Sequence, residues 1–312
     1  FVLCRGGQTV ARAMTDAAAP PQVTPESLDD FMASIERDVQ RWHDPGPMAL
    51  RRVASAITTP NWSCKPEHLK PMARQARQLG IRLHSHLSET WDYVAWARSV
   101  HGCTPMQFVA EHEWVGDDVW FAHMVHLSDD EIAYCARTGT GIAHCPQSNA
   151  RLGSGIARVP ELLKAGARVG LAVDGAASNE AADMISEAHA CWLVHRADPR
   201  AAARHDPTRE GGHAAAMTVD DVVRIGTAGG ARLLGLDGVG TIAVGQAADL
   251  AVYDLDQPRF FGLHDMAVGP VASGGRPRLK ALLVQGRVVV QDDAIPGLDL
   301  AALRRDAQAL VD

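Results

Sequence analysis

The chain has 312 residues, of which 46% are hydrophobic and 21% charged, and its net charge is −7 with neutral histidines. This balance is typical of a globular protein and argues against a disordered, collagen-like or coiled-coil chain. A net-acidic chain is also poorly suited to bind nucleic acid through bulk electrostatics. The length predicts two domains of about 150 residues, or one α/β barrel of about 250 residues with an appendage.

Cysteine usage and hydropathy predict the compartment. The six cysteines are scattered and none forms a CxxC pair, which indicates free thiols in a reducing cytoplasm. No apolar run reaches the roughly 18 residues of a membrane span, and the N-terminal FVLCRGGQTV is too short for a signal peptide. We therefore expect a cytoplasmic protein with neither a membrane nor a nucleic acid as partner.

Helical and strand-like segments alternate along most of the chain. Residues 14–23 are expected to form a linker, after which Thr24 caps a helix that ends near Trp42. The following segments are expected in this order: a strand at 50–58, a helix from Ser63 to Gly80, a strand over IRLHSHL, a helical stretch at 91–112, a strand at 119–123, a helix from Ser128 to Gly139, a strand at 141–145, a helix at 160–165, a strand at 167–174, and helices at 180–196 and 218–228.

This alternation predicts the fold class. Apolar strands that alternate with helices indicate an α/β fold with a parallel sheet and helical crossovers. The sequence changes after about residue 236, where GTIAVGQAADLAVYDLD and KALLVQGRVVVQD are typical of Gly-punctuated β-hairpins. We expect an α/β unit over residues 1–235 that carries the active site, and a small β-rich unit with a terminal helix over residues 236–312. A polar loop is expected at 198–213.

Chemically versatile side chains follow the expected strands at their carboxyl ends. They are His84, His86 and Glu89, then His123 and His126, then His144 and Cys145, and finally Asp174. The active site of an α/β barrel lies at those ends. Imidazoles with a carboxylate suit Zn²⁺ or Fe²⁺, so metal-assisted hydrolysis is the chemistry that this set allows. Singly, each residue is more often structural, and Asp174, for example, could begin a turn with Gly175; jointly, the set on successive strand ends favours function.

Four ordered motifs carry a family resemblance: HSHLSET, VWFAHMVHLSDDEI, TGTGIAHCPQSNARLGSG and VGLAVDGAASNE. Together they resemble the amidohydrolase superfamily, in its cytosine-deaminase-like and chlorohydrolase-like branch, with 8-oxoguanine deaminases and hydroxyatrazine hydrolases as the particular match. The resemblance covers almost the whole chain. It implies a (β/α)8 TIM-type barrel with a small β-sandwich appendage, one divalent metal (zinc, or alternatively iron), a small heterocyclic base as substrate, and possible homo-oligomers.

The resemblance also implies residue roles. His86 matches a metal ligand, and Glu89 the acid that handles a ring-nitrogen proton. His123 matches the histidine that contacts the attacking hydroxide or the substrate. Asp174 matches the ligand that is also the general base, which would pass its proton to departing ammonia. The substrate loops would hold a further set: Asn149, Arg151, Ser178 and Asn179. The HxE…PCxxC signature of the other zinc deaminases is absent.

One departure from the family pattern concerns the metal. The family's first-strand His-x-His pair has no match here, since His43 and His68 fall in a helix end and a helix. FVLCRG resembles the tail of a third barrel strand, so we expect roughly the first two strands to be missing and zinc binding and activity to be weak. Three hypotheses stay open: a deaminase, a triazine amino- or chlorohydrolase, and a catalytically impaired or non-enzymatic scaffold.

Overall fold

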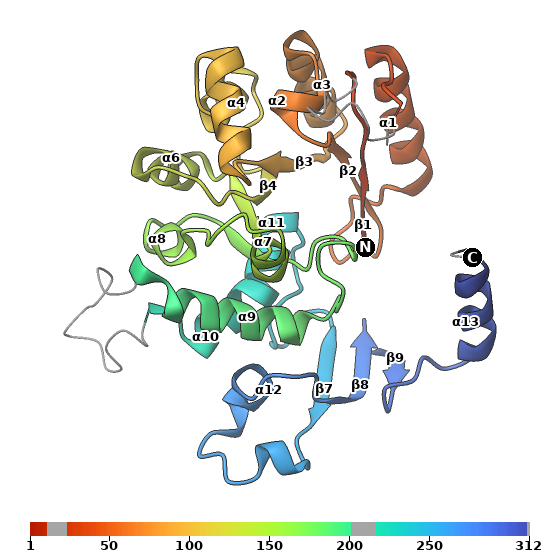
Figure 1. Ribbon diagram of the computed structural model, residues 1–312. Coiled ribbons are helices and arrows are strands. Elements are labelled where there is room, and N and C mark those ends of the chain that lie inside the picture. The colour runs from red at the N-terminus through yellow and green to blue at the C-terminus, as the bar shows by residue number, and fades with distance from the viewer. Residues whose placement is uncertain (11–23, 201–215, 311–312) are drawn as a thin grey trace.

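Six parallel strands form the central sheet of the computed structural model, which describes residues 1–10, 24–200 and 216–310 (Figure 1). The linker expected at 14–23 lies entirely outside the described residues, and so does most of the loop expected at 198–213. The sheet order follows the chain order: β1 (Val2–Arg5), β2 (Arg52–Ala56), β3 (Arg82–Leu87), β4 (Val119–His123), β5 (Gly141–His144) and β6 (Val169–Leu171). These consecutive strand–helix units confirm the α/β class and have the topology of a (β/α)8 barrel.

Helices connect successive strands. They are α1 (Leu28–Trp42), α2 (Pro60–Ser63), α3 (Pro66–Gln78), α4 (Trp91–His101), α5 (Pro105–Glu111), α6 (Asp129–Thr138), α7 (Pro146–Arg151), α8 (Val159–Lys164), α9 (Met184–Ala197), α10 (Val219–Arg224), the π-helix η3 (Ile225–Gly229) and α11 (Gly230–Leu234). The main core lies between helices and sheet, where Phe31, Leu69 and Phe121 are fully buried. Within the described residues, no helix is both long and apolar enough to cross a bilayer.

Several helix boundaries differ from the sequence expectation. Ser27, not Thr24, caps α1, because the Ser27 hydroxyl accepts the Asp30 N–H at 3.0 Å. Ser63 ends α2 instead of starting a long helix, and α3 begins after Lys65. The stretch at 91–112 is two helices, since Gly102 takes a left-handed φ of 72° and Thr104 caps α5 with a capping box.

The strand and helix nearest the end of the barrel unit also differ. The strand expected at 167–174 pairs only over β6, and the helix expected at 218–228 continues as the π-helix η3. Two glycines explain how this segment packs on the sheet. A Cβ on Gly170 would lie 3.2 Å from the Cα of Gly230, and a Cβ on Gly229 would lie 2.4 Å from the Val169 carbonyl oxygen. Backbone therefore meets backbone where η3 and α11 cross β6.

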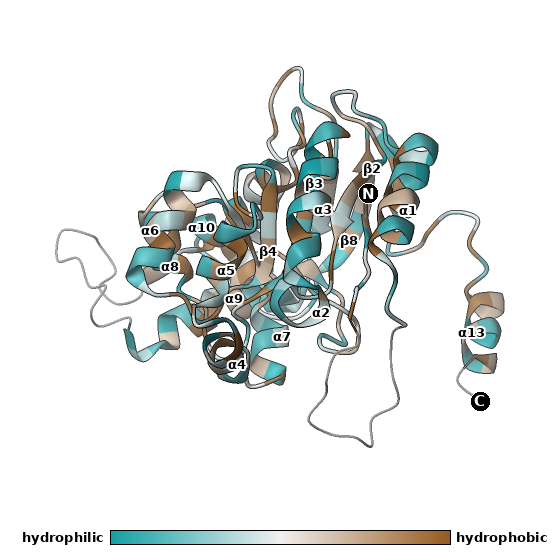
Figure 2. Ribbon diagram, turned by 90° about the horizontal axis from the view of Figure 1, so that it is seen from above, coloured by the Kyte–Doolittle hydropathy of each residue, from teal (hydrophilic) through white to brown (hydrophobic). Residues whose placement is uncertain are grey.

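The remaining chain forms the expected β-rich unit. Its antiparallel sheet has the order β7 (Leu250–Asp254), β8 (Arg278–Val284) and β9 (Arg287–Gln291). Three short helices lie between β7 and β8: η4 (Pro258–Phe260), η5 (Met266–Val268) and α12 (Gly269–Ala272), and α12 packs against α9. The last helix, α13 (Leu300–Ala309), has no buried residue and projects from the rest of the molecule (Figure 2).

Candidate active site

His86 lies on β3, where the side chains alternate between the helix-covered face and the inner face of the sheet. Leu83, Ser85 and Leu87 are buried on the helix side, so His84 and His86 share the inner face. The Nδ1 of His86 donates to the Thr58 carbonyl oxygen at 2.6 Å. Because a carbonyl only accepts, this bond places the proton on Nδ1 and leaves the Nε2 lone pair available to a metal.

His84 has a structural environment instead. Its ring stacks on Trp120 with centroids 4.8 Å apart, and its Nδ1 lies 3.3 Å from the Trp120 carbonyl oxygen. Burial, and then the proximity of His86, lower the pKa of His84 to about 4. The His84 ring is therefore neutral at pH 7, and its packing on Trp120 stabilises β3 beside the site.

His123 ends β4 and is almost completely buried. Its Nδ1 donates to the Asn149 side-chain oxygen at 2.9 Å, which fixes the same tautomer as in His86. Its ring stacks on His86 with centroids 5.4 Å apart. The free Nε2 lies 3.9 Å from a Glu89 carboxylate oxygen and 3.8 Å from one of Asp174. His123 thus sits between the two acids.

Asp174 follows β6 and faces the same space. Its Oδ2 accepts the hydroxyls of Ser148 at 2.6 Å and Ser178 at 2.9 Å. Burial by itself raises the pKa of this carboxyl, but those hydrogen bonds, the Gly175 N–H and His123 outweigh it and leave the pKa below its usual value. Asp174 is therefore an anion at neutral pH.

The backbone at these strand ends is left-handed at four residues other than glycine. Their φ angles are 48° at Ser88, 71° at His123, 43° at Met124 and 62° at Asp174. Such angles are uncommon for side chains with a Cβ and each carries about 1–3 kcal/mol of conformational strain. They turn the chain sharply as each strand ends, so that the side chains of successive strands converge.

The converged donors fit one divalent metal. The ligand atoms of His86, His123 and Asp174 all lie within 4.8 Å of one another. Two imidazoles with free Nε2 atoms and one ionised carboxylate are a donor set that suits zinc or non-haem iron. The structure thus brings together the two expected ligands, His86 and Asp174, with His123 as a third donor and Glu89 beside them.

The expected substrate residues fall into two groups. Asn149 and Ser178 touch the site through His123 and Asp174. Arg151 instead pairs with Glu180 at 2.8 Å on the surface, and the buried Asn179 donates its amide to Glu187 at 2.5 Å. A role for these four residues in binding substrate stays a prediction.

Sequence reasoning missed two supporting residues, Ser148 and Glu187. Ser148 directly precedes Asn149 in the sequence QSN, and this position next to an expected site residue could have identified it. Glu187 on α9 is completely buried and accepts the Gln147 N–H at 3.0 Å. Burial is the main reason that the pKa of Glu187 rises to about 7. Only the packing of α9 against α7 reveals this contact, since 40 residues separate the partners.

A second buried group lies behind the site, at the junction of β5 and α9. His144, Cys191 and His195 have their donor atoms within 4.8 Å of one another. The Nε2 atoms of the two histidines are 3.1 Å apart, a normal hydrogen-bond separation with one proton shared between two rings. Burial lowers the pKa of His144 far below its usual value and raises that of the Cys191 thiol. We interpret this group as a buried packing contact between β5 and α9.

Comparison with known proteins gives a consistent result. The model of the amidohydrolase family matches residues 4–289. An isoxanthopterin deaminase from an unknown prokaryotic organism is 53% identical over 100% of this chain and 65% of its own length. An 8-oxoguanine deaminase from Pseudomonas aeruginosa is 37% identical over 99% of this chain and 66% of its own length. The chain therefore spans about two thirds of the length of these relatives.

A solved structure supports the fold, and that structure is a complex with zinc. The atrazine chlorohydrolase of Arthrobacter aurescens, crystallised with zinc, superposes with a TM-score of 0.88 at 28% identity. The match covers 100% of this chain and 66% of that enzyme. The fold of the present chain, including its β-rich unit, thus occurs in a chlorohydrolase that was crystallised with zinc.

Proposed function

The chain belongs to the amidohydrolase family, and from that premise we propose that it hydrolytically deaminates an amino-substituted heterocyclic base of the 8-oxoguanine, isocytosine or isoxanthopterin type. The observation that carries the proposal is the convergence of His86, His123 and Asp174, with the Glu89 carboxylate 3.9 Å from His123. A scaffold has no physical requirement for this arrangement. Relatives that deaminate isoxanthopterin and 8-oxoguanine support the same chemistry.

We assign zinc as the cofactor, held by His86, Asp174 and His123. The fit rests on two free imidazole nitrogens and an anionic carboxylate in one small space. When bound, zinc makes water available as a nucleophile at neutral pH. We also propose a cytoplasmic location, because all six cysteines are free thiols.

The residues then divide the proton transfers between them. The attacking water supplies two protons, and its oxygen bonds to the carbon that bears the amino group. Glu89 passes one proton to the adjacent ring nitrogen, which neutralises the negative charge that forms on the ring. Asp174 takes the other and gives it to the amino group as the carbon–nitrogen bond breaks, so that ammonia leaves. His123 lies between the two acids, and its unprotonated Nε2 would hold the metal there.

The test measures ammonia release with zinc supplied in excess, since weak zinc binding by this chain stays a prediction. The substrates are 8-oxoguanine, isocytosine, isoxanthopterin and hydroxyatrazine, and Asp174→Asn is the matched inactive control. We expect ammonia from at least one of the first three and none from the variant. Release of alkylamine from hydroxyatrazine, with no ammonia from the other substrates, would favour the alternative of a triazine amino- or chlorohydrolase. The chlorohydrolase neighbour is the reason to test it. No turnover with any compound would overturn the proposal.

A further inference from the structure

Asp174 depends on two segments of the chain that are distant from each other in sequence. Its Oδ2 atom accepts the hydroxyl of Ser148, in the first turn of α7, at 2.6 Å and the hydroxyl of Ser178 at 2.9 Å. Ser178 lies in the 175–179 turn, where the N–H groups of Ser178 and Asn179 donate to the Gly175 carbonyl oxygen. Both hydroxyls reach one oxygen atom only while α7 and this turn keep a fixed separation.

The position of α7 also determines the position of His123. The Asn149 side-chain oxygen accepts the Nδ1 proton of His123 at 2.9 Å, and both side chains are buried. Because α7 has only 6 residues, a movement of its first turn displaces Ser148 and Asn149 together. Two of the three donors that we assign to the metal, His123 and Asp174, therefore depend on where the first turn of α7 lies.

Glu187 on α9 joins these two segments. Its side chain is completely buried; its Oε1 accepts the Gln147 N–H at 3.0 Å, and its Oε2 accepts the side-chain amide of Asn179 at 2.5 Å. Gln147 directly precedes Ser148, and Asn179 directly follows Ser178. Each oxygen of one carboxylate thus holds one segment, beside the serine of that segment. The packing of α9 against α7 brings Glu187 to this place (Figure 1).

Hydrogen bonding explains which side chains can replace Glu187. An apolar side chain would leave the Gln147 N–H and the Asn179 amide without these acceptors in the protein interior, which is costly for each buried donor. A glutamine keeps one oxygen for the Gln147 N–H and brings an NH₂ group in place of the other. The buried Oδ1 of Asn179, which has no hydrogen-bond partner among the described residues, can accept that NH₂ group after Asn179 turns over. Glutamine therefore preserves both links and leucine preserves neither.

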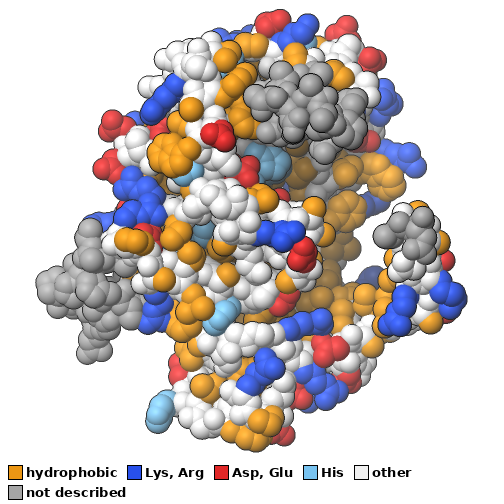
Figure 3. Space-filling model, in the orientation of Figure 1, with side chains coloured by type: hydrophobic (Ala, Val, Ile, Leu, Met, Phe, Trp, Pro, Cys, Tyr) orange, Lys and Arg blue, Asp and Glu red, His pale blue; other side chains and the backbone are white. Residues whose placement is uncertain are grey.

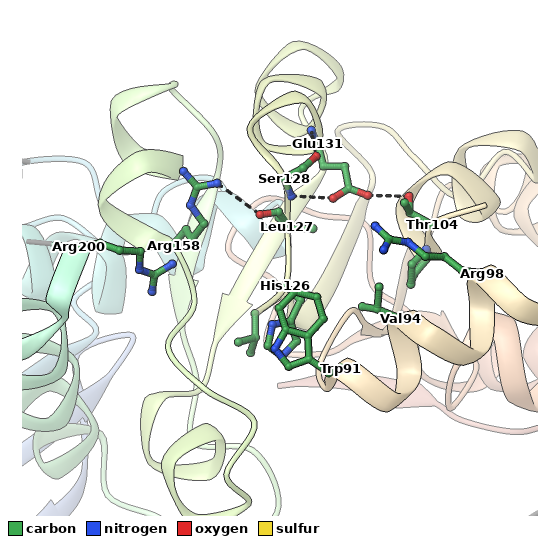
Figure 4. A pocket seen from close by; sticks show the side chains of 12 residues that line it. Trp91, Val94, Arg98, Thr104, His126, Leu127, Ser128, Glu131, Arg158 and Arg200 are labelled. Atoms are coloured by element: carbon green, nitrogen blue, oxygen red, sulfur yellow. Dashed lines mark hydrogen bonds between the residues drawn. The ribbon is translucent and has the colours of Figure 1, made fainter. Parts of the chain in front are cut away.

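The segments that follow β3 and β4 are joined in a different way. They line a pocket of about 300 Å³, where Trp91 stacks on His126 with ring centroids 4.1 Å apart (Figure 4). The side chain of Trp91 is 66% exposed, so this contact lies at the surface. A buried carboxylate that connects two segments is thus a feature of the β5 and β6 side of the sheet.

We propose that Glu187 is a positioning residue for the metal site, and that it holds His123 and Asp174 in place through α7 and the 175–179 turn. The inference rests on the proposed function for its effect on turnover, and on the contacts of these residues alone for its effect on the metal. Loss of a partner behind a metal ligand typically weakens metal binding by about 10- to 100-fold. A displacement of about 1 Å at a reactive group can lower turnover by on the order of 10²-fold.

Zinc affinity provides the test, measured by competition with a chelator on the full chain and its variants. We expect Glu187→Leu to raise the Kd for zinc by at least about tenfold, because α7 and the 175–179 turn are no longer joined. Glu187→Gln should stay within about threefold of the parent, because it keeps both links. The control is His189→Leu: His189 on the same helix donates to the Val271 carbonyl oxygen at 2.7 Å, so this variant loses a hydrogen bond of α9 to α12 and should keep the Kd of the parent.

A double variant shows whether Glu187 acts through the serines. Ser178→Ala removes one hydroxyl from Asp174. Because Glu187 holds that hydroxyl in place, Glu187→Leu should raise the Kd for zinc by a smaller factor in the Ser178→Ala chain than in the parent. If Glu187→Leu does not fold, Asn179→Ala cuts the same link from its other end and should also raise the Kd. Ammonia release from 8-oxoguanine, isocytosine and isoxanthopterin is measured on the same proteins.

The outcomes separate the positioning role from the proposed deamination. An unchanged Kd for zinc in Glu187→Leu, an equal loss of affinity in Glu187→Gln or His189→Leu, or fully additive effects with Ser178→Ala would overturn the positioning role. A parent chain that binds no zinc would overturn it as well, since no metal site would then exist to be positioned. Zinc binding that depends on Glu187 without ammonia release from any substrate would support the positioning role and count against the deamination.

Discussion

Three hydrogen bonds determine the tautomers and the charge of the reactive side chains in this site. The Thr58 carbonyl takes the Nδ1 proton of His86, Asn149 takes that of His123, and Ser148 donates to Asp174. The first two leave an imidazole lone pair on Nε2, and the third stabilises a carboxylate anion. None of the three partners is reactive itself, yet together they set the protonation state of every metal donor that we assign.

Substitution of Glu89 tests catalysis and metal binding separately. We expect Glu89→Gln to lower kcat by about 10²- to 10⁴-fold, because the amide keeps the shape of the side chain but cannot transfer a proton. Its zinc content, measured by elemental analysis, should equal that of the unchanged protein, since Glu89 is not among the three donors. Asp174→Asn should lose both zinc and turnover. A Glu89→Gln variant with unchanged kcat would remove Glu89 from the mechanism.

Glu187 makes stability depend on pH. Its pKa is near 4.5 when unfolded and about 7 in the folded chain, so the folded state holds the proton to higher pH. The free energy of unfolding should therefore fall as pH rises from about 4.5 to about 7. Glu187→Gln removes this loss and should be more stable than the parent at pH 8, by on the order of 3 kcal/mol, but not at pH 4.5. Asn179 can turn its amide oxygen toward the new NH₂ group.

Urea unfolding at pH 4.5 and pH 8 on both proteins measures this difference. The quantity of interest is the change in the variant's advantage between the two pH values, because other groups titrate equally in both chains. An advantage that is the same at both pH values would mean that Glu187 does not hold a raised pKa in the folded protein.

At the scale of elements, the sequence predicts most helices and strands from local signals, although some caps differ, and it does not predict contacts between distant elements. The cap of α6 is predictable because Ser128 and Glu131 are three residues apart and satisfy each other's backbone N–H groups. The same kind of signal predicts the wrong cap at Thr24, because Ser27, three residues later, caps α1 instead. The strand ends located His86, His123 and Asp174, since the barrel topology brings them together. The Asn179–Glu187 contact could not be predicted, because it depends on how α9 lies on the site.

The crossing of η3 over β6 gives a matched pair of substitutions. Gly229→Ala should destabilise the fold by about 1–3 kcal/mol, because the new Cβ would lie 2.4 Å from the Val169 carbonyl oxygen. Gly226→Ala in the same π-helix places its Cβ 3.6 Å from Leu171, which is ordinary contact. That variant should be neutral or slightly more stable, since alanine restricts the unfolded chain. Thermal unfolding of both proteins distinguishes them, and equal melting temperatures would contradict the packing described here.

At the scale of the whole molecule, the sheet has two unpaired edges. Among the described strands, β1 pairs only with β2 and β6 pairs only with β5. A hollow with hydrophobic walls lies between the body of the molecule and α13 (Figure 3). Open strand edges and exposed apolar surface are templates for association. The homo-oligomer that the family resemblance implies stays a prediction.

The left-handed residues at the strand ends have a consequence for how this protein can evolve. Because His123 and Asp174 owe their directions to strained backbone, an insertion or deletion of one residue there would redirect the reactive group and release the strain at once. Such changes favour a more stable and inactive chain, so selection for activity must keep the strand ends fixed in length. A change in what the proposed site accepts would therefore have to come from exchanges of side chains around it, at constant loop length.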